Sequence, residues 1–257
     1  MNISANTNSF SFSELPFRAK LTYVAHAVKA VIKQHHTWMN YLLSKFISAD
    51  SVVLDIGGHS GQYAKLFARL APQGTIYTFE PGTYPRSFLE ISIRLNQLRN
   101  VKVIGKALGE APGKLTLVTP LKASGIFRFG LAHIEKEDEN SRSAKEEVTV
   151  TTIDAFAKET GLESLSFIKI DVEGWEAQIL KGGSETINRF HPTMMVELVA
   201  SQLIRAGNDL DETWEMLRTW GYNPYIYIDN RTLVAHPEPR DGDTFWVHEQ
   251  FKGSIEP

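Results

Sequence analysis

From position 51 onward, short apolar runs alternate with amphipathic segments, and this alternation restricts the fold more than any other feature of the chain. Apolar runs flanked by helical patterns are typical of parallel strands joined by crossover helices. Nearly continuous apolarity suits strands that helices cover on both faces. The sequence therefore predicts an α/β fold with a mostly parallel sheet, whose strands are expected at Ser51–Ile56, Thr75–Glu80, Val101–Ile104, Phe167–Asp171 and Thr193–Leu198.

The remaining elements follow from the same kinds of pattern. A helix that carries Tyr63 and Leu70 on one side is predicted after the first strand. A late helix is predicted with Asp211 as its N-cap and Gly221 just beyond its end. The polar run Glu135–Glu147 is interpreted as a solvated loop. Further strands are expected at Lys114–Val118, Glu147–Ile153, Tyr225–Ile228 and Thr244–His248.

The first 50 residues are predicted to form an extension, a flexible arm and two helices, ahead of a main domain that spans 51–257. The first helix is expected within Lys20–Gln34, where apolar residues recur at helical spacing: Leu21, Val24, Ala25, Val28 and Ile32. The second carries Trp38, Tyr41, Leu42 and Phe46. Two roles are open for these helices, packing on the sheet edge or covering a bound substrate.

Composition narrows the class of function. The chain has 257 residues with 42% hydrophobic and 22% charged, which are values of a globular protein. It has no cysteine, which excludes thiol nucleophiles and thiolate metal sites. Its net charge of −3 provides no general attraction for nucleic acid. No apolar stretch is long enough for a membrane span, and the N-terminus has no secretory signal pattern, so we expect a cytoplasmic protein that acts on a small molecule.

A glycine-rich turn follows the first predicted strand. Asp55 is followed by Gly57, Gly58, His59 and Gly61, and this spacing differs from the dinucleotide-binding pattern G-x-G-x-x-G. Glycine allows a sharp turn and a close approach to the main chain. An acid at the strand end would repel a pyrophosphate, but it suits a ligand with an ammonium and a sulfonium. The sign of the charge therefore favours S-adenosylmethionine over NAD.

A second acid stands at the end of the next strand. Glu80 follows an apolar run and precedes Pro81. In nucleotide-binding α/β folds, an acid at this point accepts hydrogen bonds from the ribose hydroxyls. Two neighbouring hydroxyls match two carboxylate oxygens, so Glu80 is predicted to bind the ribose.

The segment Ser166–Glu176 is the most distinctive of the chain. Lys169 and Asp171 point to the same side of a strand because side chains alternate, and Glu173 follows just past its end. A lysine inside an apolar strand is costly unless it is paired, and these carboxylates are its nearest partners. With Glu197 from the next strand, they are predicted to form one charged cluster at the carboxyl ends of neighbouring strands.

These motifs together resemble the FkbM family of methyltransferases, over roughly Ser51 to Leu198. The family carries an acid-x-Gly-Ala-Asn turn, a strand ending in Glu-Pro and a Lys-x-Asp-x-Glu-Gly-x-Glu segment; the stretch Ala107-Leu108-Gly109 also matches. Gly58 and His59 stand where the family usually has alanine and asparagine. The resemblance implies a Rossmann-like methyltransferase fold, with seven strands of which the last is antiparallel.

The resemblance also implies a function. It implies S-adenosylmethionine as cofactor, held by the residues of the two motifs together with Ala107 and Leu108, and methyl transfer to a hydroxyl of a sugar, glycolipid or polyketide-like acceptor. Asp171 is then expected to act as general base, with Lys169, Glu173 and Glu197 around it. The alternative for this cluster is an ion network that only holds the strand ends together.

Parts of the sequence are compatible with other functions. A divalent metal held by Asp171, Glu173 and Glu197 is disfavoured because Lys169 would compete for the same oxygens. N-methylation, nucleic-acid methylation and non-catalytic binding of S-adenosylmethionine are the alternatives to O-methylation. Residues Leu121–Ile134, with Ser124, Arg128 and His133, are expected either to contact the acceptor or to form a surface excursion. The sequence leaves the oligomeric state open.

Overall fold

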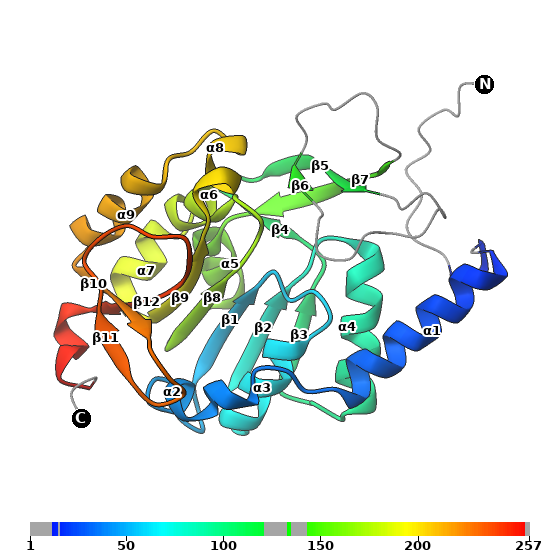
Figure 1. The fold of residues 1–257 in the computed structure, drawn as a ribbon, viewed down its shortest axis with the longest axis horizontal. Coiled ribbons are helices and arrows are strands. Elements are labelled where there is room, and N and C mark those ends of the chain that lie inside the picture. The colour runs from blue at the N-terminus through cyan, green and yellow to red at the C-terminus, as the bar shows by residue number, and fades with distance from the viewer. Residues whose placement is uncertain (1–11, 15, 121–132, 135–142, 255–257) are drawn as a thin grey trace.

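A computed structural model describes residues 12–14, 16–120, 133–134 and 143–254. Its centre is an 8-stranded sheet in the order β3–β2–β1–β8–β9–β12–β10–β11 (Figure 1). The first five strands of that order are parallel, whereas β12 is antiparallel to both of its neighbours. The strands are β1 Val52–Ile56, β2 Thr75–Phe79, β3 Val101–Ile104, β8 Phe167–Ile170, β9 Thr193–Leu198, β10 Tyr222–Tyr227, β11 Leu233–Ala235 and β12 Gly242–His248.

This arrangement confirms the predicted fold class. Seven strands, β3 to β10 in the spatial order, form the expected sheet with β12, the last of them in sequence, antiparallel, and the short β11 adds an eighth strand at the edge. A smaller 4-stranded sheet has the order β4–β7–β5–β6. Its strands are β4 Ala107–Leu108, β5 Gly113–Pro120, β6 His133–Ile134 and β7 Ser143–Thr151.

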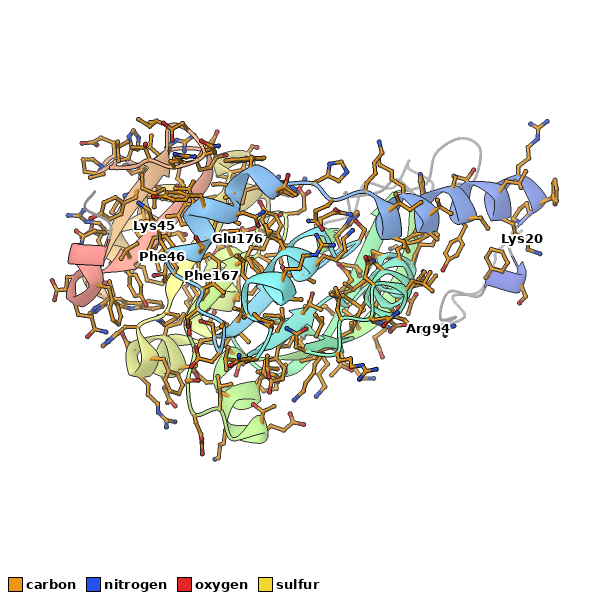
Figure 2. All side chains as sticks on the ribbon, turned by 90° about the horizontal axis from the view of Figure 1, so that it is seen from below. Lys20, Lys45, Phe46, Arg94, Phe167 and Glu176 are labelled. Atoms are coloured by element: carbon orange, nitrogen blue, oxygen red, sulfur yellow. The ribbon has the colours of Figure 1, made fainter. Side chains whose placement is uncertain are left out.

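Helices cover both faces of the main sheet (Figure 1). Alternate residues of β1 feed two cores, because Val53 packs with α2 and α3 while Leu54 packs with α5, α6, α7 and α9. Phe46, which follows α2, stacks on Phe167 of β8, with the ring centroids 6.5 Å apart (Figure 2). The helices are α1 Phe17–Ile32, α2 Asn40–Ser44, α3 Gln62–Leu70, α4 Thr83–Leu95, α5 Ile153–Thr160, α6 Glu176–Lys181, α7 Ser184–Phe190, α8 Ala200–Arg205 and α9 Leu210–Thr219. The 3₁₀ turns are η1 Phe12–Glu14, η2 Thr37–Met39 and η3 Glu249–Ser254.

The smaller sheet corrects two sequence-based expectations. The strand expected to continue to Ile153 ends at Thr151, because the Thr152 hydroxyl accepts the Ala155 N–H at 2.9 Å and starts α5. The polar run expected as a loop also contributes its end to β7, where Glu147 is paired with Lys114 of β5 at 2.6 Å. Polar side chains alternate outward on a strand with one solvated face, so polarity alone does not indicate a loop there.

The N-cap predicted for the late helix is also wrong. Asp209, not Asp211, accepts the backbone N–H of Glu212 at 3.1 Å and begins α9. Both acids lie just before the apolar residues of this helix, so the sequence pattern does not distinguish them, and the N-cap depends on where the backbone becomes helical. Gly221 follows the helix with φ of 82°, as predicted for that position, and β10 begins immediately after it.

The long N-terminal helix α1 presents its apolar stripe outward. Figure 2 shows α1, which carries Lys20, lying along the outer side of α4, which carries Arg94. The inner face of α1 uses Tyr23 and Ala30 against Phe88 of α4. Four residues of the predicted apolar stripe are the exposed ones, at 57% for Leu21, 50% for Val24, 49% for Val28 and 74% for Ile32. Within the part of the chain that the structure describes, no helix is both long and apolar enough to cross a bilayer.

Candidate active site

The glycine-rich turn lies between β1 and α3, at the carboxyl end of the sheet. Gly57 and Gly58 both donate their N–H groups to the carbonyl of Phe79, at 3.0 and 2.9 Å, which ties the turn to the end of β2. Gly57, His59 and Gly61 all have positive φ, of 82°, 46° and 82°. A positive φ is strained for a residue with a Cβ, so two of these positions favour glycine and His59 occupies the third under constraint.

The glycines are required by protein atoms that already surround the turn. A Cβ on Gly57 would lie 1.9 Å from the carbonyl oxygen of Asp171. A Cβ on Gly58 would lie 2.1 Å from Oγ1 of Thr78, and one on Gly61 would lie 2.8 Å from Leu89. The turn is therefore packed tightly against β2, β8 and α4, which is a further reason for glycine beside close approach of a ligand.

Asp55 is fully buried beneath the turn. Its Oδ2 accepts the hydroxyl of Thr78 at 2.9 Å, and its Oδ1 has no hydrogen-bond partner among the described residues. Burial raises the pKa of Asp55, although Lys169 and the Thr78 hydroxyl oppose that shift. An unpaired carboxylate oxygen at this depth is costly unless something donates to it.

Glu80 holds the turn from the other side. Its Oε2 accepts the N–H of His59 at 2.9 Å and its Oε1 accepts that of Gly82 at 3.0 Å. The pKa of Glu80 is raised to about 7, because the effect of burial exceeds that of the two backbone donors, which lower it. Each carboxylate oxygen keeps a further lone pair. Burial and the nearby Lys169 lower the pKa of the His59 ring to about 4, so His59 is neutral at physiological pH.

The other predicted cofactor residues are placed differently. Pro81 directly follows Glu80, and its carbonyl oxygen accepts a hydrogen bond from the Arg86 guanidinium at 2.7 Å. Ala107 and Leu108 form β4 of the smaller sheet, and their side chains are buried in apolar clusters. A role of those two residues in cofactor binding stays a prediction.

Lys169 connects the turn to the carboxylates of the next strands. It lies in β8 with 3% of its surface exposed, and its Nζ donates to the Gly57 carbonyl at 3.2 Å and pairs with Asp171 at 3.1 Å. The same Nζ lies 5.2 Å from the ring centroid of Tyr63. Burial opposes the charge of Lys169, but Asp171 and Asp55 outweigh it and raise its pKa. Lys169 is thus a buried cation shared by the turn and the cluster.

Asp171 and Glu197 form a carboxyl pair that shares a hydrogen bond. Burial opposes ionisation of Asp171, but the Lys169 ammonium outweighs it and holds the pKa of Asp171 below its ordinary value. Burial and the Asp171 charge raise the pKa of Glu197 to about 8. Near neutral pH the pair therefore holds one proton, which resides on Glu197. The Asp171 side chain remains 40% exposed at this edge of the sheet.

Glu173 lies apart from that pair. Its carboxylate accepts from the Gln202 amide of α8 at 2.7 Å, and its charge contributes to raising the pKa of Glu197. Its neighbour Glu176 is buried, and its Oε1 accepts the N–H groups of Val172 and Gly174, each at 3.1 Å. Glu176 therefore holds the loop after β8 in shape. Of the four residues expected in the cluster, Lys169, Asp171 and Glu197 are in direct contact, and the Glu173 carboxylate is bound to Gln202 instead.

Three further residues, which the sequence analysis did not select, face the cluster. Asp243 of β12 is paired in register with Glu197, and burial and Asp171 raise its pKa. The rings of His36 and Tyr63 stack at 4.5 Å. Burial lowers the pKa of His36, with Lys169 adding to that shift and Asp171 opposing it, whereas burial and the charges of Asp243 and Asp171 raise the pKa of Tyr63. An acid near the start of an antiparallel strand meets the ends of its parallel neighbours, which is a signal for Asp243. We find no sequence signal for His36.

The expected acceptor segment is largely outside the described residues. Ser124 and Arg128 lie there, and His133 belongs to β6, paired in register with Val118 of β5. Across the ranges that the structure describes, no group of three or more His, Asp and Glu side chains has an arrangement suited to a metal ion.

The sheet order, the glycine turn after β1 and the acids at the neighbouring strand ends define the methyltransferase type of α/β fold. An O-methyltransferase structure from Bacillus cereus shares it, with a TM-score of 0.50 at 12% identity over 92% of this chain and 93% of that one. The family model of the methyltransferase FkbM domain matches residues 55–224. The chain belongs to this family, as the resemblance implied.

Two curated relatives match part of the chain. The 2-O-methyltransferase NoeI of Sinorhizobium fredii is 26% identical over 58% of this chain and 63% of its own length. Methyltransferase 1 of Beauveria bassiana is 26% identical over 60% of this chain and 66% of its own length. The chain spans less than two thirds of the length of either relative.

Proposed function

We propose that this protein is an S-adenosylmethionine-dependent O-methyltransferase that acts on a hydroxyl of a small molecule, such as a sugar, glycolipid or polyketide-like compound. The observation that carries the proposal is the contact of Lys169 with both the glycine turn and Asp171. It brings a cofactor-type turn and a pair of carboxyl groups to one edge of the sheet. The family membership and the name of NoeI, a 2-O-methyltransferase, support methylation at oxygen.

The residues around the turn fit S-adenosylmethionine. The unpaired Oδ1 of Asp55 lacks a donor, which the ammonium group of the cofactor would supply directly or through water. The free lone pairs of Glu80 suit the two ribose hydroxyls. When bound, the cofactor supplies a methyl group activated by the neighbouring sulfonium.

The carboxyl pair would orient the acceptor and take its proton. Asp171 is ionised and partly exposed, so it can accept a hydrogen bond from the acceptor hydroxyl. An alcohol is a very weak acid, but its proton becomes far more acidic as the oxygen gains the methyl group, so even a carboxylate of low pKa can then receive it. Lys169 keeps Asp171 ionised, and the protonated Glu197 holds it in position.

Replacing Asp171 tests this role. Asp171→Asn is nearly isosteric, and on the proposed mechanism it lowers kcat by about 10² to 10⁴-fold, the usual range for a lost acid–base group, while the affinity for S-adenosylmethionine is unchanged. The measurement combines methyl transfer to a panel of hydroxylated acceptors with calorimetry of cofactor binding. The matched control is Asp211→Asn, an exposed aspartate of α9, which should retain full activity. Unchanged turnover with a lower melting temperature would mean that the cluster is structural.

A further inference from the structure

The helix α1 carries a continuous apolar stripe on its outer side. At about 100° per residue, Phe17, Leu21, Val24, Val28 and Ile32 fall within one arc of the helix surface. Their exposed fractions run from 49% for Val28 to 75% for Phe17. Among the described residues, twelve large hydrophobic side chains are exposed, and eight of them lie between Phe12 and Tyr41. Such a concentration marks a binding surface.

The charges around this stripe have one sign. Residues 16–49 contain the basic residues Arg18, Lys20, Lys29, Lys33 and Lys45 and have no Asp or Glu, in a chain whose net charge is −3. On the helix surface, Arg18 and Lys29 flank the stripe on one side and Lys20 on the other. An apolar stripe between basic flanks is complementary to a partner that is apolar and anionic at once.

We propose that α1 binds the surface of an anionic lipid bilayer, with its axis in the plane of the interface. A basic amphipathic helix with these flanks is the arrangement of interfacial helices, whose apolar side chains enter the boundary of the acyl chains. The aliphatic stems of Lys and Arg allow their charges to reach the lipid headgroups. Binding at the surface differs from spanning, for which α1 has 16 residues and too much charge.

The helix is already held in place for this contact. Its inner face packs on α4 through Tyr23, and the buried Lys65 of α3 donates to the carbonyls of Ala30 and Lys33 at its C-terminal end, each at 2.6 Å. The stripe therefore needs no refolding to meet a membrane. Lys65 also joins the C-terminal end of α1 to α3, the helix that begins at the glycine turn.

Exposed aromatic residues extend the surface beyond α1. Trp38 and Tyr41 are 42% and 50% exposed in the segment that follows. The Tyr41 ring lies 5.5 Å from the Lys45 ammonium and 5.4 Å from the Arg231 guanidinium. Tyr and Trp next to cations are typical of the headgroup region of membranes.

A second copy of the chain fits this surface poorly. Two α1 helices packed on their stripes would face the same basic residues toward each other, since residues 16–49 provide no acid to pair with them. Like charges in contact oppose such pairing. The lipid bilayer supplies both the apolar depth and the negative charge.

Vesicle flotation tests the proposal. The purified chain should float with vesicles of phosphatidylcholine and phosphatidylserine, float much less with phosphatidylcholine alone, and be released by high salt. Replacing Arg18 and Lys29 together with Gln should lower partitioning about 30-fold, at about fivefold for each charge. Val24→Asp with Val28→Asp should lower it at least as much, because apolar area is lost and repulsion is added.

The controls separate this surface from general effects. Ile204→Asp changes an apolar residue that is 64% exposed on α8 and should leave flotation unchanged. Lys158→Gln with Lys181→Gln removes the same charge from other exposed helix positions. All changed side chains are exposed, so thermal melting should be nearly constant. Failure of the wild-type chain to float with anionic vesicles would overturn the proposal.

Two other results would also overturn it. Equal loss in the stripe and control variants would mean that binding is not located on α1. A dimer in analytical ultracentrifugation that Val28→Asp dissociates would show a second copy on this surface. The outcome is independent of methyl transfer, so failure of the proposed enzymatic function would leave it standing.

Discussion

Gly58 and Thr78 form a pair whose coupling can be measured. Gly58 has no positive φ, so its backbone conformation is open to alanine, and the cost of a methyl group there comes from contact alone. That methyl group would lie 2.1 Å from Oγ1 of Thr78, which must move. Moving it breaks the hydrogen bond from Thr78 to the buried Asp55.

The expected magnitudes follow from these contacts. Gly58→Ala should lower the free energy of unfolding by about 2–4 kcal/mol, from overpacking of about 1–3 kcal/mol together with a weakened buried hydrogen bond. Thr78→Ala should cost about 1–3 kcal/mol, because it leaves a second oxygen of Asp55 without a donor. In the double variant the two methyl groups no longer meet an oxygen. Its cost should therefore be about 1–3 kcal/mol less than the sum of the single costs.

Urea unfolding of the four proteins, followed by circular dichroism, measures this cycle. Gly113→Ala is the matched control, since a Cβ there meets no atom within 4 Å and should change stability little. Additive costs, or a neutral Gly58→Ala, would refute the view that Thr78 is what requires glycine at position 58.

Two further predictions concern buried carboxyl groups. Because burial raises the pKa of Glu80 to about 7, the affinity for S-adenosylmethionine should fall as the pH drops below about 7, by at most tenfold per pH unit. Calorimetry should show that Glu80→Gln removes this dependence. An affinity of the wild-type protein that does not change with pH would contradict the prediction. Burial likewise raises the pKa of Glu176 from 4.5 to about 7. Between pH 4.5 and 7 the folded state then holds a proton that the unfolded state has lost. The free energy of unfolding of the wild-type protein should therefore fall by up to about 3 kcal/mol over this range, relative to that of Glu176→Gln. Urea unfolding that gives the same stability difference between the two proteins at both pH values would disprove this.

The sequence by itself was sufficient for the central sheet. β1, β2, β3, β8 and β9 lie within one residue of their expected ranges. β1, β2, β8 and β9 lie inside the sheet and are largely buried on both faces, so their apolar runs are nearly continuous and their ends are sharp, whereas β3 lies at the sheet edge and is only partly buried. The strands on the antiparallel side of the sheet were less well predicted: β10, which lies between β12 and β11, begins three residues early, and the edge strand β11 was not expected. Both strands have a mixed, partly exposed surface, and their pairing depends on their neighbours more than on their own pattern.

The site was partly readable from the sequence for a related reason. Lys169 and Asp171 share a side of one strand, and Glu197 lies on the next parallel strand, so strand periodicity and sheet order bring them together. Glu173 follows the strand, where periodicity ends. Its φ of 59° turns it to Gln202.

Only the tertiary structure decided which groups complete the site and which face of α1 is exposed. Asp243 meets Glu197 because β12 inserts antiparallel beside β9. Periodicity predicted the helix α1 and its stripe, but a stripe can face a core, a membrane or a partner equally well. Tyr23 and Ala30 pack on α4 and leave the stripe outside. Local patterns determine the conformation of a segment, whereas its environment depends on contacts between residues far apart in the chain.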